Sequence, residues 1–429
     1  MNDIFRRKVH VYGGGTVTHI SNHLSLSATA YGHTALALAG LAKSRFELCD
    51  TELHLTKMAG GTSLETNESI DAHLKGVIAD PLTKVIFFSC AIVDWEPVHM
   101  SVRELHDITT TDTYFTFGKN VRRLQTENCL DLSILLRPAE KLIRQIREVR
   151  KDLFLVSFKT TCDACPQEMF EAGLRQCKKA HSNLVFVNDV VTRKQMIVTP
   201  EEAAYGEDKE RGAALEELVE MAYYRSHLTF TQSTVISGDP VPWTDSRVPD
   251  SLRKVVEYCI EGNAYKPFLG ATVGHFAVKI SDTEFLTSIR RSDFNKLRET
   301  GLVFVRTDGP DTVIAYGAKP SVGGQSQRMI FRDHPGYDCV VHFHCPLRGD
   351  HRDDIPIRSQ REVECGSHQC GQNTSDGLKQ FGDLKAVYLD RHGPNIVFPR
   401  NINPQQVIDF ITANFDLTQK TGGYNLAPT

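Results

Sequence analysis

Two histidines stand one residue apart at the end of an apolar run, in the stretch VVHFHCP at 340–346. If this run is a strand, His342 and His344 point to the same face, because strand side chains alternate with a period of two. Two imidazoles on one face form half of a metal site. By itself such a pair is more often a coincidence than a pair of ligands, so the question is whether further ligands exist.

A third histidine follows another apolar run, in the stretch AVYLDRHGPNIVF, where His392 precedes Gly393. Two imidazoles from one strand end and one from another could meet as a three-nitrogen site with an open coordination position. That arrangement is typical of a catalytic zinc site, because structural zinc sites are closed by four protein ligands. The pattern therefore predicts a metal centre at the ends of two strands.

Five motifs accompany these histidines in order: GHFAVK at 274–279, TSIR at 287–290, KPSVGG at 319–324, HPGYDCVVHFHCP at 334–346 and DRHG at 390–393. Together they resemble the class II aldolase family, which includes sugar phosphate aldolases and epimerases, a dehydratase and adducin head domains. The resemblance covers about residues 250 to 415. It implies an α/β/α fold and a divalent metal bound by His342, His344 and His392, with zinc as the preferred ion. Such a metal polarises a carbonyl or enediolate oxygen as a Lewis acid.

Three positions depart from that family's pattern. Gly323 stands where the family has the proton-transferring Glu, His275 stands in place of an Asn, and Arg290 in place of a Gly. Since general acid–base catalysis needs a titrating group, the domain either catalyses a different reaction or keeps its metal for structure. The sequence offers these replacement groups: Gln325, Asp333, Glu364 and His368.

Two cysteine-containing stretches raise the question of further metal sites. ECGSHQC places Cys365, His368 and Cys370 close together, and CDAC places Cys162 three residues before Cys165. A polar loop is the favoured interpretation of the first stretch. The stretch CDAC has no second CxxC nearby and no thioredoxin-like context, so zinc binding or a redox function is the less favoured interpretation there.

The first half of the chain has polar residues at the ends of apolar runs. VYGGGT puts glycines and Thr16 after the first run, AIVDWEP ends in Asp94, and FVNDV ends in Asn188 and Asp189. Ligands of open parallel sheets bind beyond the carboxyl ends of the strands. Glycines there let backbone N–H groups approach anionic oxygens, although a tight structural turn explains three glycines equally well. A plain turn is likewise the simpler explanation of the Asn–Asp pair alone.

Six features of the first half occur in a fixed order: Gly14-Gly15-Thr16, AIVDWEP, Lys119 in FGKNVRR, LVSFK, VNDVV, and Lys209 before a long helix. In this order they resemble phosphopantothenoylcysteine synthetase over about residues 8 to 228. That family uses a nucleoside triphosphate to activate a carboxylate as an acyl-nucleotidylate, which cysteine attacks to form an amide. The family's acid-binding loop is altered here, with Asn22 and Gly32 as its remnants, so a different acid is an open alternative.

The resemblance carries roles to particular residues. Asn188 would hold the acyl phosphate, and Lys209 and Lys119 would neutralise phosphate charge. The cofactor would be CTP or ATP with Mg²⁺. The residues expected to line the nucleotide site are Gly14, Gly15, Thr16, Asp94 and Asp189.

Strands that alternate with helices in the first half predict a doubly wound, Rossmann-like parallel sheet. Closely spaced strands in the second half predict a mostly antiparallel sheet in an α/β/α class II aldolase-like domain. The expected domains are residues 1–231 and 250–429, with a Pro-, Gly-, Asp- and Ser-rich linker at 232–249 between them. The 429 residues suit two or three domains.

Composition limits the partners and the compartment. The formal charge of −4 gives no global basic field for nucleic acid, and no apolar run is long enough for a membrane span. An odd count of eleven scattered cysteines and the lack of a signal-like N-terminus favour a cytoplasmic protein with reduced thiols.

The resulting expectation is a two-domain enzyme: a nucleotide-dependent C–N ligase fused to a zinc-dependent aldolase- or dehydratase-like lyase domain. Small carboxylate and amine substrates, and at least a homodimer, are expected. Two alternatives stay open. The second domain could be a non-catalytic oligomerisation module, or the whole chain a nucleotide-binding regulatory or scaffold protein.

Overall fold

The structure, a computed structural model, describes residues 6–106, 109–121, 123, 126–127, 129–268, 270–321 and 324–421. The chain divides into two compact units. The first consists of Met1–Thr160, Arg175–Asn188 and Asp208–Ser226, and the second of Thr161–Leu174, Asp189–Glu207 and His227–Thr429. In the described part of the chain, no helix has the length and apolar character needed to cross a membrane.

The main sheet at the N-terminal end of the chain has seven strands in the order β12-β11-β10-β9-β5-β1-β4. Strand β1 pairs in parallel with β4 and β5, and β5 pairs in parallel with β9, which confirms the predicted Rossmann-like parallel sheet. Continuous apolar runs build these strands because a parallel sheet is covered on both faces. The strands are β1 (Arg7–Gly13), β4 (Cys49–Leu55), β5 (Thr83–Phe88), β9 (Phe154–Thr161), β10 (Leu184–Asp189), β11 (Gln195–Val198) and β12 (Ala204–Tyr205).

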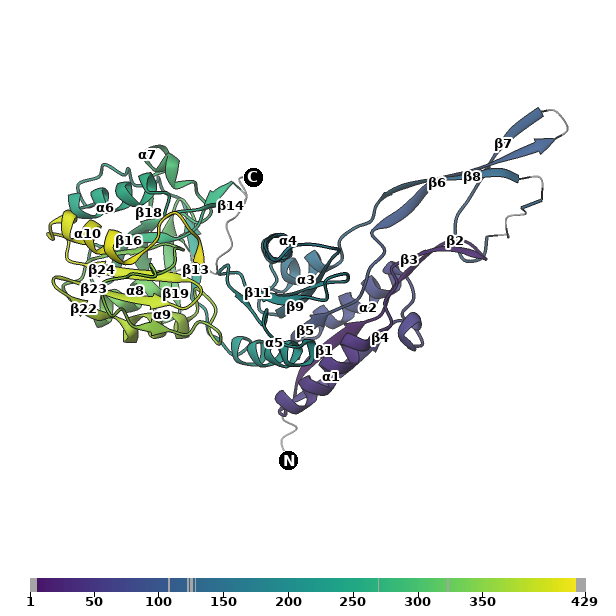
Figure 1. The fold of residues 1–429 in the computed structure, drawn as a ribbon, viewed down its shortest axis with the longest axis horizontal. Helices are drawn as coiled ribbons and strands as arrows, with labels where there is room; N and C mark the ends of the chain where they lie inside the picture. Colours follow the sequence, from purple (N-terminus) through teal and green to yellow (C-terminus); the bar gives the residue numbers. More distant parts are fainter. Residues whose placement is uncertain are drawn as a thin grey trace. The chain divides into compact units, whose positions relative to one another are not determined.

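Helices cover both faces of this sheet (Figure 1). On one face, α1 (His33–Arg45) packs against β1, β4 and α5 (Arg211–Arg225), and Arg45 pairs with Glu220 of α5 at 3.1 Å. On the other face, α2 (Asn67–Ala79) and α3 (Ile143–Val149) share a core with Tyr12. A further helix, α4 (Pro166–Ala180), follows β9.

A capping box begins α2. The Thr66 side chain accepts from the Ser69 backbone, and the Ser69 hydroxyl accepts from the Thr66 backbone, so two unpaired N–H groups of the first turn are satisfied.

Small antiparallel sheets interrupt the alternating pattern of the first unit. Strand β6 (Trp95–His106) lies between β7 (Thr109–Phe115) and β8 (Cys129–Pro138), and these long strands form the ribbon drawn in blue in Figure 1. Strands β2 (Val17–Ser21) and β3 (Leu24–Ser27) form a separate hairpin, and η1 (Lys57–Ala59) is a short 3₁₀ turn. The sequence analysis did not predict the three-stranded ribbon.

The second unit contains a ten-stranded sheet in the order β13-β19-β18-β17-β16-β20-β24-β23-β21, with β22 beside β23. Most pairs are antiparallel, as predicted, and the edge pairs β13–β19 and β21–β23 are parallel. The strands are β13 (Gln232–Ile236), β16 (His275–Lys279), β17 (Glu284–Ser288), β18 (Leu302–Thr307), β19 (Thr312–Tyr316), β20 (Cys339–His342), β21 (Ile357–Arg358), β22 (Lys379–Phe381), β23 (Leu384–Leu389) and β24 (Gly393–Phe398). Strand β13 lies within the segment expected as a linker.

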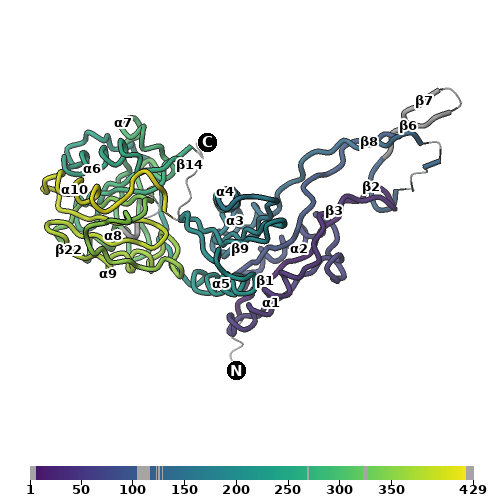
Figure 2. The backbone as a smooth tube through the Cα atoms, viewed as in Figure 1, coloured from purple at the N-terminus to yellow at the C-terminus, as the bar shows by residue number. Residues whose placement is uncertain are grey.

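This sheet is packed on both faces, which gives the predicted α/β/α layers. One core joins it to α6 (Asp250–Glu261) and α10 (Pro404–Asn414), and a second core joins it to α8 (Gly324–Asp333). Helix α9 (His368–Gly377) packs beside α8. In Figure 2 the described parts of the chain between α6 and α10 pass from green to yellow. The remaining short elements are β14 (Pro267–Phe268), β15 (Ala271–Thr272), η2 (Phe294–Lys296) and α7 (Leu297–Thr300).

Candidate metal centre and nucleotide site

The predicted histidine pair lies at the end of the central strand β20. His342 is the last residue of β20, and its neighbours in register are His275 on β16 and Asn395 on β24. Residues directly opposite one another in adjacent strands share a face. Val340, two residues before His342, belongs to the core under α8, so the row His275–His342–Asn395 also faces α8.

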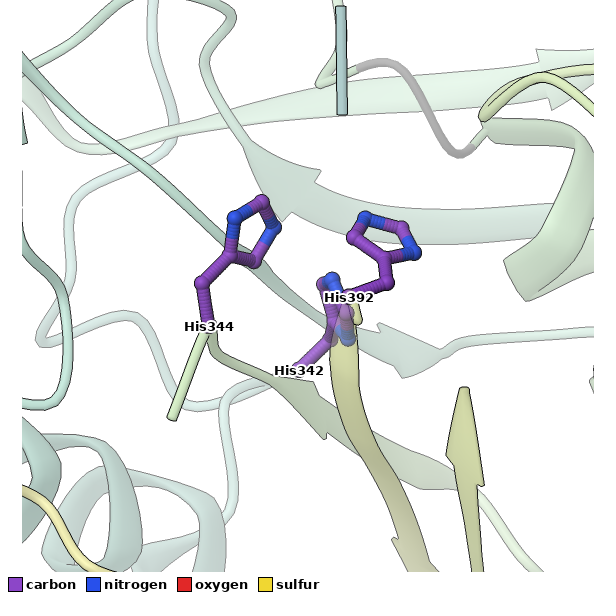
Figure 3. A group of neighbouring side chains, drawn as sticks. All are labelled: His342, His344 and His392. Atoms are coloured by element: carbon purple, nitrogen blue, oxygen red, sulfur yellow. The ribbon is translucent and has the colours of Figure 1, made fainter. Parts of the chain in front are cut away.

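The structure brings His342, His344 and His392 together, as the spacing predicts. One ligand nitrogen from each lies within 4.8 Å of the others, and their ring centroids are 4.6–5.0 Å apart. Figure 3 shows the three rings turned toward a common space. None is more than 6% exposed, so the centre is buried.

The hydrogen bonds of these rings fit a metal centre. His342 Nδ1 lies 2.8 Å from the carbonyl of Pro394, so Nδ1 carries the proton and donates it. This leaves a lone pair on His342 Nε2, which is buried and lacks a hydrogen-bond partner among the described residues, as does His392 Nδ1. Buried nitrogens are rarely left unpaired. Three imidazole nitrogens that lie this close together are a donor set that suits a zinc-class ion.

A carboxylate that the sequence analysis missed lies against this centre. Glu202 Oε2 is 3.5 Å from His344 Nδ1, and the same oxygen pairs with the ammonium of Lys420. Both Glu202 and Lys420 are about 1% exposed. Glu202 has a φ of 70°, a left-handed conformation that costs free energy for a non-glycine residue and is often found at functional sites. A carboxylate at Nδ1 keeps the proton there and leaves His344 Nε2 for a metal.

His275 is a fourth histidine at the centre, 4.8 Å from His342 between ring centroids. The Nε2 amide of Gln327, on α8, donates to His275 Nδ1 at 3.0 Å, which leaves the ring proton of His275 on Nε2. Burial, together with the neighbouring histidines, lowers the pKa of His275 to about 3 and that of His342 well below its usual range. Both rings are therefore neutral at pH 7, which is the form that binds a metal or donates one hydrogen bond.

The other proposed proton-transfer groups have different surroundings. Asp333 pairs with Arg332 at 2.6 Å and accepts from Ser375 at 3.0 Å. His368 Nε2 lies 3.2 Å from Asp311, and Glu364 lies in the turn before α9. Gly323 and the side chain of Gln325 lie outside the described residues.

The cysteine stretches do not add a metal cluster. Cys365, Cys370 and His368 are not among the groups of described residues that could hold an ion. A hydrogen bond with Cys370, together with burial, raises the pKa of the Cys365 thiol well above its usual value. Cys162 and Cys165 are exposed free thiols.

In the first unit, the glycine turn after β1 is packed against the unit's own chain. Gly14 has a φ of 98°, and a Cβ there would lie 2.1 Å from the Thr56 hydroxyl. A Cβ on Gly15 would lie 1.8 Å from the carbonyl oxygen of Ala28. These contacts explain the glycines by close packing, and a nucleotide contact at this turn stays a prediction.

Thr16 and Asp94 also have partners in the first unit. The Thr16 hydroxyl donates to Asn67 Oδ1 at 2.7 Å and accepts from the backbone of Val93 at 2.9 Å, which ties the turn to α2 and to the segment between β5 and β6. Asp94 pairs with Lys141. Both residues lie beyond the carboxyl ends of β1 and β5, at the sheet edge where ligands of this fold class bind.

The two predicted phosphate lysines each pair with a carboxylate. Lys119 Nζ is 2.7 Å from Glu65, and Lys209 Nζ, ahead of α5, is 3.1 Å from the buried Glu217. Asn188 lies at the end of β10, half-buried. Lys119 lies between β7 and β8, Lys209 precedes α5, and Asn188 is the penultimate residue of β10, so their meeting around one ligand stays a prediction.

Asp189 organises the loops at the end of β10. Its two carboxylate oxygens accept hydrogen bonds from the Thr161 hydroxyl and from the backbone N–H groups of Asp163, Ala164, Val191 and Thr192, at 2.8–3.2 Å. Burial raises the pKa of Asp189, but the hydrogen bonds from Ala164 and Thr192 outweigh it and hold this pKa below its usual range.

Asp189→Asn is expected to lower the thermal unfolding midpoint at neutral pH, because an amide nitrogen would face N–H donors. A depressed pKa in the folded state gives stability that is present above the unfolded-state pKa of about 3.9 and is lost as pH falls through the folded value. The difference from wild type should therefore shrink below about pH 4. Asp383→Asn, at an exposed turn, is the control, and an unchanged midpoint for Asp189→Asn would contradict the assignment.

Comparison with solved structures finds related folds for both halves. The DNA/pantothenate metabolism flavoprotein from Streptococcus pneumoniae is 15% identical, with a TM-score of 0.38, and the match covers 50% of this chain and 96% of that chain. The C-terminal domain of the coenzyme A biosynthesis bifunctional protein CoaBC is 12% identical, with a TM-score of 0.34 and coverages of 50% and 94%. An L-fuculose 1-phosphate aldolase is 18% identical, with a TM-score of 0.31 and coverages of 39% and 83%. Likenesses this distant identify no activity or substrate.

No curated protein matches the chain significantly. A family model does match part of it: residues 253–398 match the model described as Class II Aldolase and Adducin N-terminal domain. The matched range contains β16, β20 and β24, which carry or flank the histidine cluster. Residues 253–398 of the second half are thus similar to the class II aldolase and adducin family, and the first half has only the distant structural likenesses given above.

Proposed function

We propose that the second unit is a metal-dependent lyase that acts on a small acidic or phosphorylated metabolite. The observation that supports this most is the convergence of three buried imidazoles, His342, His344 and His392, with one ligand nitrogen of each within 4.8 Å of the others. A bound divalent cation would supply Lewis-acid polarisation of a carbonyl or enediolate oxygen. All three histidines lie within residues 253–398, the range that matches the class II aldolase and adducin family model, and this supports the proposal.

The chain's own groups would prepare the site in three ways. The carbonyl of Pro394 fixes the tautomer of His342, and Glu202 orients His344 through Nδ1. His275 presents its Nε2–H at the centre, where the family has an Asn amide, so a hydrogen-bond donor is kept although the residue differs. Burial excludes water, which strengthens each of these electrostatic contacts.

For the first unit we infer nucleotide-dependent activation of a carboxylate, followed by amide formation. The order of motifs and the parallel sheet support this inference, since Thr16 and Asp94 follow the carboxyl ends of β1 and β5, and Asn188 lies at the carboxyl end of β10. Lys119 and Lys209 would exchange their present carboxylate partners for the phosphates of CTP or ATP. Fusion of the two units suggests sequential steps on one small acidic metabolite, carried out by at least a dimer in the cytoplasm.

The purified chain is expected to release pyrophosphate from CTP or ATP with Mg²⁺ when 4′-phosphopantothenate and cysteine are both present. Lys209→Ala should slow this release by about 100-fold or more, which is the cost of losing one preorganised charge at a reacting group. Lys151→Ala, at an exposed position, is the matched control. If release occurs without the acid, or is equally fast in Lys209→Ala, the ligase assignment fails.

A second candidate keeps the ligase and makes the metal domain a non-catalytic assembly module. The absence of the family's Glu at Gly323 favours it, as does His275 in place of Asn. The two candidates differ in what His342→Ala changes: loss of a lyase reaction supports the first, and loss of the oligomer alone supports the second.

A further inference from the structure

A second histidine cluster lies in the first unit, far along the sequence from the aldolase-like motifs. His10 of β1 lies beside Glu52 of the edge strand β4 in the parallel register, and Tyr12 lies beside His54. Side chains two residues apart on a strand share a face, so His10, Glu52 and His54 all point toward α2. Neither the ligase resemblance nor the aldolase family model assigns a role to these residues.

The three ligand atoms are spaced like the corners of a coordination polyhedron. His10 Nδ1 is 3.0 Å from His54 Nε2, Glu52 Oε2 is 3.5 Å from His10 Nδ1, and Glu52 Oε2 is 3.9 Å from His54 Nε2. Zinc–ligand bonds of about 2.0–2.1 Å in a tetrahedral site separate neighbouring ligand atoms by about 3.3 Å. The observed separations bracket that value, so an ion fits with small side-chain adjustments.

The tautomer of His10 is fixed by a hydroxyl behind it. Thr83 Oγ1 donates its proton to the carbonyl of Val77 at 2.7 Å, so toward His10 it can only accept. His10 Nε2, 3.2 Å from that oxygen, therefore carries the ring proton. The lone pair of the neutral ring then lies on Nδ1 and points at His54 and Glu52. An outer partner that fixes the ring in this way is typical of metal-binding histidines.

The electrostatic surroundings agree with this placement. Burial lowers the pKa of His10 and of His54 to about 4, so both rings are neutral at pH 7. Lys8 Nζ occupies the other carboxylate oxygen of Glu52 at 3.1 Å and also pairs with Asp80, which leaves Oε2 for the histidines. His73 of α2, whose ring centroid is 4.5 Å from that of His54, has its Nδ1 engaged by the Tyr12 hydroxyl at 2.8 Å.

We propose that His10, Glu52 and His54 bind a divalent first-row transition ion of the zinc class and thereby fasten the edge strand β4 to β1. Two imidazoles and one carboxylate suit Zn²⁺, Co²⁺, Ni²⁺ or Cu²⁺ better than Mg²⁺ or Ca²⁺, which take oxygen ligands. The Glu52 side chain is 39% exposed, so an ion can reach the cluster from the side of this carboxylate. The site is separate from the one at His342 and does not depend on the function proposed for it.

The test compares metal binding by matched variants of the whole chain after removal of metal with a chelator. Titration with Co²⁺, followed by visible absorption, and with Zn²⁺, followed by calorimetry, is expected to show one equivalent fewer in His54→Gln than in wild type. His23→Gln, at an exposed position in the β2–β3 turn, is the control and should bind as wild type does. Because the result is a difference between variants, metal bound at His342 cancels out.

The role of Thr83 adds a graded readout. Thr83→Val keeps the three ligands but removes the acceptor of His10 Nε2–H, so the number of equivalents should stay the same while affinity at this site falls about 10- to 100-fold. Equal stoichiometry and equal affinity in wild type, His54→Gln and Thr83→Val would overturn the proposal.

A measurement on the wild-type chain keeps the proposal testable if the variants fold poorly. Diethyl pyrocarbonate modifies accessible imidazoles, and the modified residues are identified by peptide mass spectrometry. Zn²⁺ is expected to slow the modification of His54 and to leave that of the exposed His23 unchanged. Modification of His54 at the same rate with and without Zn²⁺ would contradict metal binding there.

Discussion

His342→Ala is expected to remove one equivalent of zinc from the chain. His342 is the central histidine of the cluster, and its Nε2 is a buried lone pair that the Pro394 carbonyl holds in place. Loss of a residue that hydrogen-bonds to a metal ligand weakens metal affinity by about 10- to 100-fold. Loss of a direct ligand should weaken zinc affinity by more than this. Because zinc bound at this centre stabilises only the folded state, it should raise the thermal unfolding midpoint of wild type. His342→Ala should lack this part of the increase.

Two further variants calibrate this result. Glu202→Gln removes the charge that orients His344 and should cost about 10- to 100-fold in affinity without changing the stoichiometry. His351→Ala, at an exposed position in the same unit, should bind zinc as wild type does. Equal zinc binding by His342→Ala and wild type would contradict the assignment of the centre.

Gly393→Ala is expected to destabilise the second unit strongly and to separate the metal histidines. Gly393 follows His392 with a φ of 129°, and a Cβ there would lie 2.1 Å from the carbonyl oxygen of Phe343. That oxygen belongs to the backbone between His342 and His344, so one of the two chain segments must move. We expect the free energy of unfolding to fall by about 4 kcal/mol or more, which is exceptional for a single substitution. Zinc binding at this centre should be lost as well.

Two other glycine substitutions distinguish the effect of the steric clash from the effect of the left-handed backbone conformation. Gly336→Ala, at a φ of 90° with open space around the new Cβ, should cost about 1–2 kcal/mol for the left-handed backbone alone. Gly349→Ala, with open space and no positive φ, should lie within about 0.5 kcal/mol of wild type.

Unfolding of the second unit can be followed by the fluorescence of Trp243, which is buried in its core, in a background that carries Trp95→Phe. A Gly393→Ala variant no less stable than Gly336→Ala would contradict the close approach of the two segments.

The parts of the molecule that the sequence predicts are those with local signals. Apolar runs predicted strands β1, β5, β9, β10 and β20 because a buried strand needs little more than continuous hydrophobicity. The period-two spacing of His342 and His344 predicted that they share a face, and the position of His392 after another apolar run pointed to it as the third ligand. The three-stranded ribbon of β6, β7 and β8 was missed, although VHMSVREL and LDLSILLR contain alternating apolar residues.

The parts that could not be predicted depend on contacts distant in sequence. Glu202 reaches the histidine centre from a segment 140 residues before His342, and Lys209 is the only residue near it that the sequence analysis singled out. The meeting of His10 with Glu52 and His54 depends on the register of two parallel strands, which no single segment encodes. The close contacts of Gly14 with Thr56 and of Gly15 with Ala28 likewise join residues that are distant in sequence, so the local pattern GGGT could not reveal them.

X-ray absorption spectroscopy of the zinc-loaded chain, in the His54→Gln variant so that one centre dominates, tests the central claim most directly. Coordination by His342, His344 and His392 predicts about three imidazole nitrogens at about 2.0–2.1 Å and a light-atom ligand in the open position. A first shell that contains sulfur at about 2.3 Å, or oxygen without the scattering pattern of imidazole rings, would contradict it.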